Sequence, residues 1–205
     1  MSNPYTSFKF VSSAKLPTRF GQFVIHGFLD ESNNQEHVAL SYGEWAEDDV
    51  VPIRIHSECL TGDALFSTKC DCGFQLERAL QNIVENGSGV LLYLRQEGRG
   101  IGLLNKIKAY SLQDEGYDTV EANEHLGFDA DLRDYSICKT MLDTLKVKRV
   151  ELMTNNPKKC TALHNMGIDV VRLKAIDHGV TDANKGYLKT KTEKLGHTFN
   201  TDHLK

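Results

Sequence analysis

The second half of the chain alternates short apolar stretches with amphipathic stretches, and this alternation is the feature that most limits the fold. The run Val90–Leu94 is continuously apolar, as expected of a strand that is buried on both faces. Arg149–Met153 and Ile168–Leu173 form two further strand patterns, with a helix between them that begins at Asn156-Pro157. Strands that alternate with helices in this way indicate βαβ units.

Apolar residues at helical spacing predict three further helices, at Phe74–Glu85, Leu103–Leu112 and Arg133–Lys146. In the last of these, the residues expected to face inward are Ile137, Met141, Leu142 and Leu145. A polar helical tail is expected to begin near Asn184.

The first part of the chain shows apolar alternation in three segments: Gly21–Phe28, His37–Tyr42 and Val50–His56. Alternation of this kind predicts an antiparallel β portion at the N-terminus. We therefore expect an α/β fold with a mixed sheet, flanking helices and an antiparallel β N-terminal portion. Residues 1–205 are expected to form a single domain with a flexible N-terminus and a flexible C-terminal tail.

Composition and charge limit the class of protein. The chain has 205 residues, of which 40% are hydrophobic and 25% are charged, as is typical of a globular protein. Its formal net charge of −4 argues against a nucleic-acid partner, because such proteins usually carry a basic surplus. We expect no membrane association and a cytoplasmic location, because no apolar run reaches the roughly 20 residues of a membrane span and residues 1–17 lack the apolar core of a signal peptide.

Three of the five cysteines lie close together in the sequence: Cys59, Cys70 and Cys72. Thiolates bind Zn²⁺ tightly, and a catalytic zinc ion keeps three protein ligands and one open position. The pattern therefore favours a catalytic zinc site. One alternative is a closed structural site with His56 as the fourth ligand, and another is a set of buried reduced thiols without a metal. Cys138 and Cys160 fall at helical positions and are expected to play no part in the cluster.

The residues before the first of these cysteines bring a cation and a carboxylate close to the expected metal. Arg54-Ile55-His56-Ser57-Glu58 runs directly into Cys59. The carboxylate of Glu58 is suited to orienting a metal-bound water or accepting a hydrogen bond from a substrate N–H, and its alternative role is that of a surface carboxylate.

Two strand-to-helix junctions are candidate anion sites. In Gln96-Glu97-Gly98-Arg99-Gly100-Ile101-Gly102, glycines allow backbone N–H groups to approach an anion at the start of a helix, and Arg99 adds a charge. The glycine spacing differs from that of dinucleotide-binding sites, and an ordinary tight turn is the alternative. The second junction is Thr154-Asn155-Asn156-Pro157-Lys158-Lys159, where Thr154 offers a hydroxyl and Lys159 an ammonium group. Ordinary helix capping with solvated lysines is the alternative.

Three further residues have ordinary structural explanations when they are taken alone. Asp131 is expected to cap the helix that starts there, Arg133 to pair with a nearby acid at the surface, and Tyr110 to be a core aromatic residue.

Taken in order, several blocks of the sequence resemble the GTP cyclohydrolase II family. Each block is only moderately specific, but the ordered set is highly specific and covers about Arg54 to His197. The blocks are Arg54–Asp63, Cys70–Gly73, Arg95–Leu103, Thr154–Lys159, and Tyr187-Leu188 through Gly196-His197.

The resemblance implies hydrolysis of GTP to formate, pyrophosphate and 2,5-diamino-6-ribosylamino-4(3H)-pyrimidinone 5′-phosphate, the entry step of riboflavin synthesis. It implies one Zn²⁺ per chain, a requirement for Mg²⁺, and a homodimer. By position, the zinc ligands are Cys59, Cys70 and Cys72. The nucleotide contacts are Arg54, Ile55, His56, Ser57, Glu58, Gln75, Glu97, Gly98, Arg99, Thr119, Thr154 and Lys159. Asp131 matches the proton acceptor, Arg133 the nucleophile toward phosphorus, and Tyr110 a catalytic tyrosine.

Two rival functions are open at this point. A zinc nucleobase deaminase shares the His-x-Glu element at His56-Ser57-Glu58, but Cys70-Asp71-Cys72 lacks the proline and the two-residue spacer of Pro-Cys-x-x-Cys. The other rival is a zinc-stabilised binding module without turnover. Release of ammonia in place of formate indicates the first, and GTP binding without hydrolysis indicates the second.

Overall fold

The computed structural model describes residues 7–129, 131–176 and 178–196. The chain separates into two compact units, each built from discontinuous segments. The sheet unit comprises Met1–His56, Arg78–Arg95 and Tyr135–Ile176. The cysteine unit comprises Ser57–Glu77, Gln96–Asp134 and Asp177–Lys205. A single domain over residues 1–205 stays a prediction, and residues 1–6 and 197–205, where flexible ends are expected, lie outside the described part.

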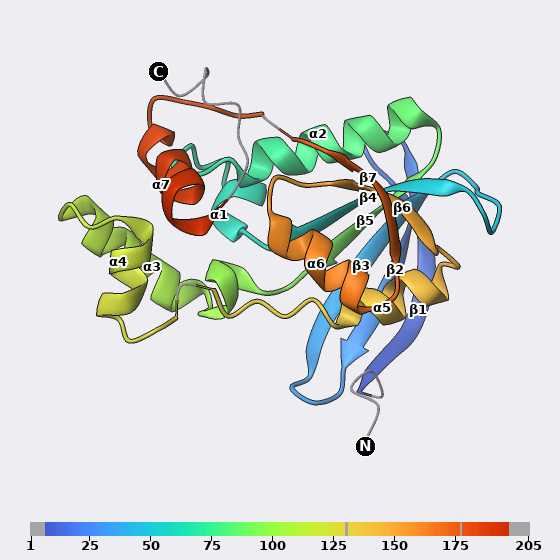
Figure 1. Cartoon of the computed structure of the whole chain (residues 1–205), viewed down its shortest axis with the longest axis horizontal. Helices are drawn as coiled ribbons and strands as arrows, with labels where there is room; N and C mark the ends of the chain where they lie inside the picture. The colour runs from blue at the N-terminus through green and yellow to red at the C-terminus, as the bar shows by residue number, and fades with distance from the viewer. Residues whose placement is uncertain (1–6, 130, 177, 197–205) are drawn as a thin grey trace. The chain divides into compact units, whose positions relative to one another are not determined.

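A seven-stranded sheet in the order β1-β2-β3-β5-β4-β6-β7 forms the frame of the sheet unit (Figure 1). Its first part is antiparallel: β1 (Phe8–Pro17) pairs with β2 (Gln22–Asp30), β2 with β3 (Gln35–Tyr42), and β3 with β5 (Gly89–Leu94). The remaining strands β4 (Val50–Ser57), β6 (Arg149–Met153) and β7 (Asp169–Lys174) are parallel to one another. The expected mixed sheet with an antiparallel N-terminal portion is confirmed.

One strand was assigned to the wrong part of the sheet. Val50–His56 was expected in the antiparallel opening, but β4 lies between β5 and β6 and pairs in parallel with β6. The burial of β4 explains the difference, since six consecutive residues from Val51 to His56 are buried. A strand buried on both faces belongs in the interior of a sheet.

Helices cover both faces of this sheet. The helix α2 (Cys72–Asn86) packs against one face at β5. A Cβ on Gly89 of β5 would stand only 3.1 Å from the side chain of Ile83 of α2. Alternate residues of a strand face the same side, so Gly89 and Leu91 face α2. Val90 and the next two alternate residues of β5 face the other side and belong to the main hydrophobic core.

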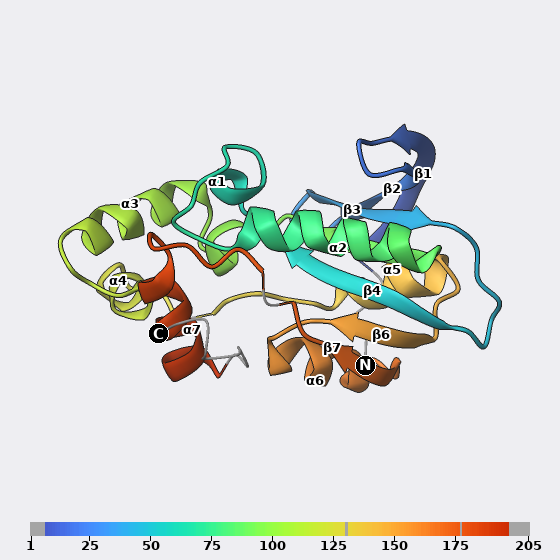
Figure 2. The same ribbon diagram turned by 90° about the horizontal axis from the view of Figure 1, so that it is seen from above.

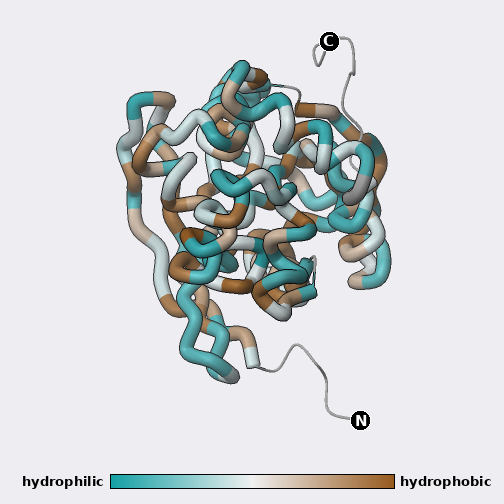
Figure 3. Tube along the Cα trace, turned by 90° about the vertical axis from the view of Figure 1, so that its left-hand side faces the viewer, coloured by the Kyte–Doolittle hydropathy of each residue, from teal (hydrophilic) through white to brown (hydrophobic). Residues whose placement is uncertain are grey.

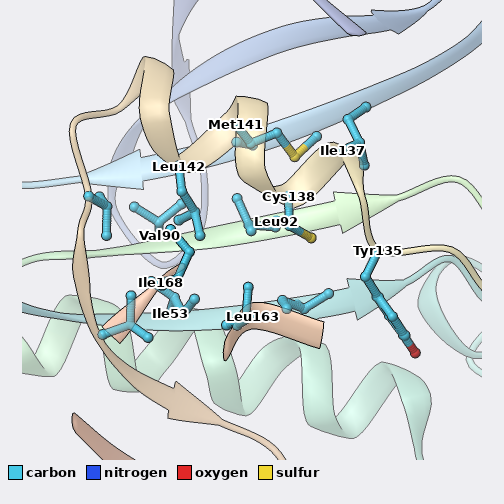
Figure 4. Close-up of a cluster of buried hydrophobic side chains, with 14 of the residues drawn as sticks. Ile53, Val90, Leu92, Tyr135, Ile137, Cys138, Met141, Leu142, Leu163 and Ile168 are labelled. Atoms are coloured by element: carbon cyan, nitrogen blue, oxygen red, sulfur yellow. The ribbon is translucent and has the colours of Figure 1, made fainter. Parts of the chain in front are cut away.

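That core packs two helices against the sheet (Figure 4). They are α5 (Ile137–Thr144), which contributes four buried residues, and α6 (Pro157–Asn165), which contributes Leu163. The helix α6 begins as expected, with the Asn156 side chain accepting a hydrogen bond from the Lys158 N–H. Together β6, α6 and β7 form the expected βαβ unit.

The remaining helices belong wholly to the cysteine unit, and Figure 2 shows them from a second direction. They are α1 (Leu60–Asp63), the 3₁₀ turn η1 (Glu97–Gly100), α3 (Leu103–Asp114), α4 (Thr119–His125) and α7 (Lys185–Leu195). The helix near Asn184 is therefore confirmed. The strand β1 and the helix α4 were not predicted, although the capping box of α4, formed by Asp118 and Glu121, is visible in the sequence.

The helix predicted over Arg133–Lys146 is shorter than expected. It begins only at Ile137, because Arg133 is held by an ion pair with Asp131 and Tyr135, in a segment without regular secondary structure, is buried in the main core. Asp131 is therefore not the cap of this helix. Ile137, Met141 and Leu142 are buried as expected, and Leu145 is partly buried against the core.

Hydrophobic and hydrophilic residues are interleaved along the trace (Figure 3). Within the described residues, no helix is long and apolar enough to span a membrane.

Candidate functional site

The three clustered cysteines converge in the cysteine unit, as their spacing predicts. Cys59 precedes α1 and Cys72 is the first residue of α2. The Sγ atoms of Cys59, Cys70 and Cys72 lie within 4.8 Å of one another, and Cys59 Sγ lies 3.6 Å from Cys70 Sγ. No other group of three or more potential metal ligands gathers in the part of the chain that the structure describes.

Two glycines allow the chain to bring these sulfur atoms together. A Cβ on Gly62 would stand 2.9 Å from Cys70 Sγ, and a Cβ on Gly73 would stand 2.2 Å from the carbonyl oxygen of Gly62. A side chain at either position would separate α1 from the start of α2. The Asp63 carboxylate fixes the other end of α1, where it accepts a hydrogen bond of 3.0 Å from the Cys59 N–H.

A buried lysine and a buried glutamate adjoin the first thiol. Lys106 Nζ donates to Cys59 Sγ at 3.1 Å and to Glu97 Oε1 at 2.8 Å. Glu97 Oε2 also accepts a hydrogen bond from the Leu60 N–H at 2.6 Å. Burial alone would lower the pKa of Lys106, but the negative charge of Cys59 and the bond to Glu97 raise it above its usual value.

The three thiols do not ionise alike. Hydrogen bonds with the Cys70 and Cys72 thiols hold the pKa of Cys59 well below its usual value, and the nearby Lys106 ammonium acts in the same direction. The bond with Cys59 raises the pKa of Cys70 to about 11. Of these two thiols, Cys59 is therefore the more acidic.

A second buried charge pair holds the residue between two of the cysteines. The Asp71 side chain is 1% exposed, and its Oδ1 accepts a hydrogen bond of 2.6 Å from Lys191 Nζ of α7. Its other oxygen accepts a hydrogen bond of 2.6 Å from the side-chain amide of Gln75, which the family resemblance assigns to the nucleotide. The ammonium of Lys191 also lies 4.5 Å from the centre of the Tyr187 ring.

Tyr110 lies beside the cysteine cluster and is only half-buried, so the expectation of a core aromatic residue is wrong. Its hydroxyl lies 3.3 Å from Thr61 Oγ1, which in turn lies 3.6 Å from Cys59 Sγ. Lys69 Nζ and Lys106 Nζ lie 5.1 and 5.6 Å from the ring centre. Burial raises the pKa of the Tyr110 hydroxyl above its usual value.

Two N–H groups of the glycine-rich loop are bonded to Glu97, and the loop also buries the end of the Arg99 side chain. The Gly98 N–H donates to Glu97 Oε1 at 2.9 Å and the Gly102 N–H donates to the Glu97 carbonyl at 3.0 Å. Arg99 adopts the left-handed conformation, with φ of 60°. Its two terminal guanidinium nitrogens are buried, and among the described residues no acceptor bonds to them. This is a place where an anionic ligand would satisfy buried donors.

Arg133 and Asp131 form a two-point ion pair within the cysteine unit. Arg133 Nε lies 2.7 Å from Asp131 Oδ1, and Arg133 Nη2 lies 2.9 Å from Asp131 Oδ2. Both side chains are largely buried, so the expectation of a surface pairing for Arg133 is wrong.

The other candidates of the cysteine unit are spread over three elements. Ser57 follows the buried part of β4 and accepts a hydrogen bond from the Gln96 side chain at 3.0 Å. Glu58 is half-buried beside Cys59, and Thr119 is the first residue of α4.

Five candidates lie in the sheet unit, at the carboxyl ends of the neighbouring parallel strands β4 and β6. Lys159 Nζ donates to the Ile55 carbonyl at 2.8 Å, and Arg54 Nη1 donates to the Met153 carbonyl at 3.0 Å. Thr154 Oγ1 accepts a hydrogen bond from the Asn156 N–H at 3.0 Å. His56, which the sequence left open as a fourth metal ligand, stacks on Tyr93 with ring centres 5.4 Å apart. Ligands of open α/β sheets bind at such carboxyl ends.

Three residues of the site are not predicted from the sequence: Lys106, Asp71 and Lys191. The inward position of Lys106 has no clear sequence signal, because the apolar residues Leu104 and Ile107 of the same helix are the exposed ones. The pairing of Asp71 with Lys191 has no local signal, because the two residues are 120 positions apart.

Comparisons with known proteins point to one family. The model of the family described as GTP cyclohydrolase II matches residues 9–174. The chain is similar to the GTP cyclohydrolase-2 of Colwellia psychrerythraea, with 60% identity over 93% of this chain and 94% of the relative. It is also similar to the GTP cyclohydrolase-2 of Shewanella baltica, with 58% identity over 97% of each chain.

Two further matches cover only part of the matched protein. A riboflavin biosynthesis protein of Vibrio vulnificus is 56% identical over 98% of this chain, and the chain spans 55% of that relative's length. A solved two-domain 3,4-dihydroxy-2-butanone 4-phosphate synthase from A. baumannii matches 84% of this chain and 41% of its own, with 15% identity and a TM-score of 0.49. A likeness at that level supports no conclusion about function.

The buried pair of Asp71 and Lys191 gives a testable stability difference. Lys191→Met leaves the Asp71 carboxylate buried without its cation, and we expect the free energy of unfolding in urea to fall by roughly 3–5 kcal/mol. The matched control is Lys189→Met on the same helix, because Lys189 is 70% exposed and pairs with Glu193 at the surface. Its expected loss is below about 1 kcal/mol. Asp71→Asn in the Lys191→Met background should restore part of the stability; equal stability of both single variants would contradict the role of the pair.

Proposed function

The chain belongs to the GTP cyclohydrolase II family, and from this premise we propose that it hydrolyses GTP to formate, pyrophosphate and 2,5-diamino-6-ribosylamino-4(3H)-pyrimidinone 5′-phosphate. The family and the names of the relatives support this reaction as a step of riboflavin biosynthesis. The observation that carries the proposal is the convergence of three thiols beside a buried lysine and a half-buried tyrosine.

We propose one Zn²⁺ per chain, bound by Cys59, Cys70 and Cys72. Sulfur donors suit Zn²⁺, and three protein ligands leave a position for water or substrate, as in catalytic zinc sites. The cluster supports this assignment because its three sulfur atoms lie within 4.8 Å of one another. A zinc ion bound there would supply Lewis acidity and activate water for attack on the imidazole ring.

Tyr110 is proposed as the proton donor to the opening ring. Its raised pKa keeps the hydroxyl protonated at neutral pH, which is the form required for donation. Its contact with Thr61 holds the hydroxyl near the cysteine cluster. Glu58, on the chain next to Cys59, is proposed to accept a hydrogen bond from the purine.

Asp131 and Arg133 are proposed to act on the proton and on the phosphorus, respectively. In the two-point ion pair, the Asp131 carboxylate is stabilised in its ionised form and both of its oxygens are engaged. An anionic phosphate that binds Arg133 competes with Asp131 for the guanidinium, and its arrival therefore makes the carboxylate more available as a base. We propose this electrostatic role for Arg133 in place of covalent attack, because a guanidinium with a pKa above about 12 is a poor nucleophile.

Basic residues of the chain are proposed to bind the phosphates of GTP. Arg99 supports this, because its buried terminal nitrogens need an acceptor. In the sheet unit, the start of α6 supplies Thr154 and the buried Lys159. Mg²⁺ is proposed to accompany the triphosphate, as it does in many nucleotide sites. The other proposed nucleotide contacts are Arg54, Ile55, His56, Ser57, Gln75, Glu97, Gly98 and Thr119.

A homodimer in the cytoplasm is proposed as the working form. Leu104 and Ile107 of α3 are 74% and 51% exposed, and the loop after α1 exposes Leu65 and Phe66. Apolar side chains of this size are often covered by a partner subunit.

The five free cysteines suit a reducing compartment, and the net charge of −4 speaks against a nucleic-acid partner.

The metal assignment is tested by Cys70→Ser, assayed with GTP and Mg²⁺ for formate, pyrophosphate and ammonia. We expect the wild-type protein to bind one zinc and to release formate, and the variant to lose both properties because the hydroxyl is a much poorer zinc ligand than a thiolate. Cys160→Ser on α6 is the matched control and should behave as wild type. Full formate release by a zinc-free variant would refute the metal assignment, and ammonia without formate would indicate a deaminase.

Replacement of Tyr110 by Phe removes the proposed proton donor and keeps the ring. We expect kcat to fall by about 100-fold or more and KM for GTP to change little, because the hydroxyl acts in the transition state. Tyr117→Phe is the control, since Tyr117 lies after α3 in the same unit and is exposed. A kcat equal to that of the control would remove Tyr110 from the mechanism.

A further inference from the structure

The helix α3 turns a lysine inward and two large apolar residues outward. Lys106 is 8% exposed, whereas Leu104 and Ile107 are among the exposed hydrophobic residues of the chain. A buried ammonium group costs free energy unless charged or polar partners surround it. The position therefore serves a purpose other than filling the core, and the partners of Lys106 indicate what that purpose is.

Those partners belong to the cysteine site. The ammonium group bonds to the sulfur of Cys59 at 3.1 Å and to Glu97 at 2.8 Å. Glu97 also accepts the N–H of Leu60, the residue that follows Cys59. Lys106 and Glu97 together thus hold both the side chain of Cys59 and the backbone directly after it.

The negative charge around the cluster also favours a cation at this place. A Zn²⁺ ion with three thiolates carries a net charge of −1, and the neighbouring Glu97 adds another negative charge. The Lys106 ammonium group, 3.1 Å from Cys59 Sγ and 2.8 Å from Glu97 Oε1, is placed to offset part of this negative charge.

A hydrogen bond to a coordinating sulfur also reduces the electron density that the sulfur donates. Three thiolates donate more charge than three imidazoles and weaken the Lewis acidity of the metal that they bind. Groups that bond to metal ligands tune the metal in this way and are nearly as important as the ligands themselves.

We propose that Lys106 is a positioning residue of the zinc site: it fixes Cys59 Sγ, offsets the charge of the three thiolates, and thereby preserves the affinity for zinc and its Lewis acidity. This inference rests on the proposed assignment of the three cysteines to Zn²⁺. It adds a residue from α3 to a site whose proposed ligands come from the segment Cys59–Cys72.

The test compares Lys106→Met, Lys106→Gln and the control Lys108→Met in the full chain. Lys108 is exposed on the same helix, and its ammonium group donates a hydrogen bond of 3.4 Å to the Asn105 side chain. Zinc affinity is measured by competition with a chromophoric chelator. We expect both Lys106 variants to bind zinc about 10–100-fold more weakly than wild type, and the control to match wild type.

Cobalt substitution separates this role from a general loss of packing. In Co²⁺-loaded protein, the thiolate-to-cobalt charge-transfer band reports the electron density on sulfur. Loss of the hydrogen bond in Lys106→Met should move that band to longer wavelength. The amide of Lys106→Gln can still donate a hydrogen bond, so its band should move less although its affinity falls.

The possible failures are distinguishable. Wild-type protein that binds no zinc would overturn the proposed function as well as this inference. Wild-type zinc binding together with unchanged affinity and an unchanged cobalt band in Lys106→Met would overturn the inference alone. If both Lys106 variants unfold even with excess zinc, as circular dichroism would reveal, Lys106 is a structural residue and the proposal is also overturned.

Discussion

The close approach of two backbone segments is what puts three sulfur atoms in one place. The carbonyl of Gly62 occupies the space that a Cβ of Gly73 would need, and Cys70 Sγ lies against the backbone of Gly62. Neither contact forms with a larger residue, because the neighbouring atoms are backbone or a sulfur whose position is itself constrained. Without this approach the start of α2 moves away from α1, and Cys72 is separated from Cys59. Every function proposed for the cysteine unit depends on this one packing constraint.

Gathering thiols creates an electrostatic problem that the surrounding helices solve. Lys106 reaches the first sulfur from α3, and Lys191 reaches Asp71 from α7. Each of these buried cations has a carboxylate partner as well, so neither charge is isolated. Buried pairs of this kind add little net stability, but loss of one member leaves a costly unpaired charge. The helices α3 and α7 therefore contribute chiefly to the charge balance around the cysteines.

The sequence predicts those parts of the structure that have a local signal. Asn156-Pro157 marks the start of α6, because capping is a matter of neighbouring residues. The spacing of the three cysteines predicts their convergence. The pairing of β4 could not be predicted, since its apolar run fits either an edge alternation or a buried strand. The apolar spacing predicts a helix from Arg133, whereas α5 begins at Ile137. The spacing of apolar residues carries no information about the ion pair that holds Arg133 to Asp131. The ion pair of Asp71 with Lys191 depends on the tertiary fold alone.

The orientation of α3 shows why a hydrophobic pattern can mislead at a functional site. Burial of Leu104 and Ile107 would give α3 an apolar inward face and more stability per buried area. The structure instead turns Lys106 toward Cys59 Sγ, and Leu104 and Ile107 remain exposed. This exchange is unfavourable for an isolated unit, because it buries a charge and exposes two large side chains. It becomes favourable when the thiolate charge attracts the lysine and another surface covers the leucine and the isoleucine. The same rotation of one helix thus connects the charge of the cysteine site with the proposed association of two chains.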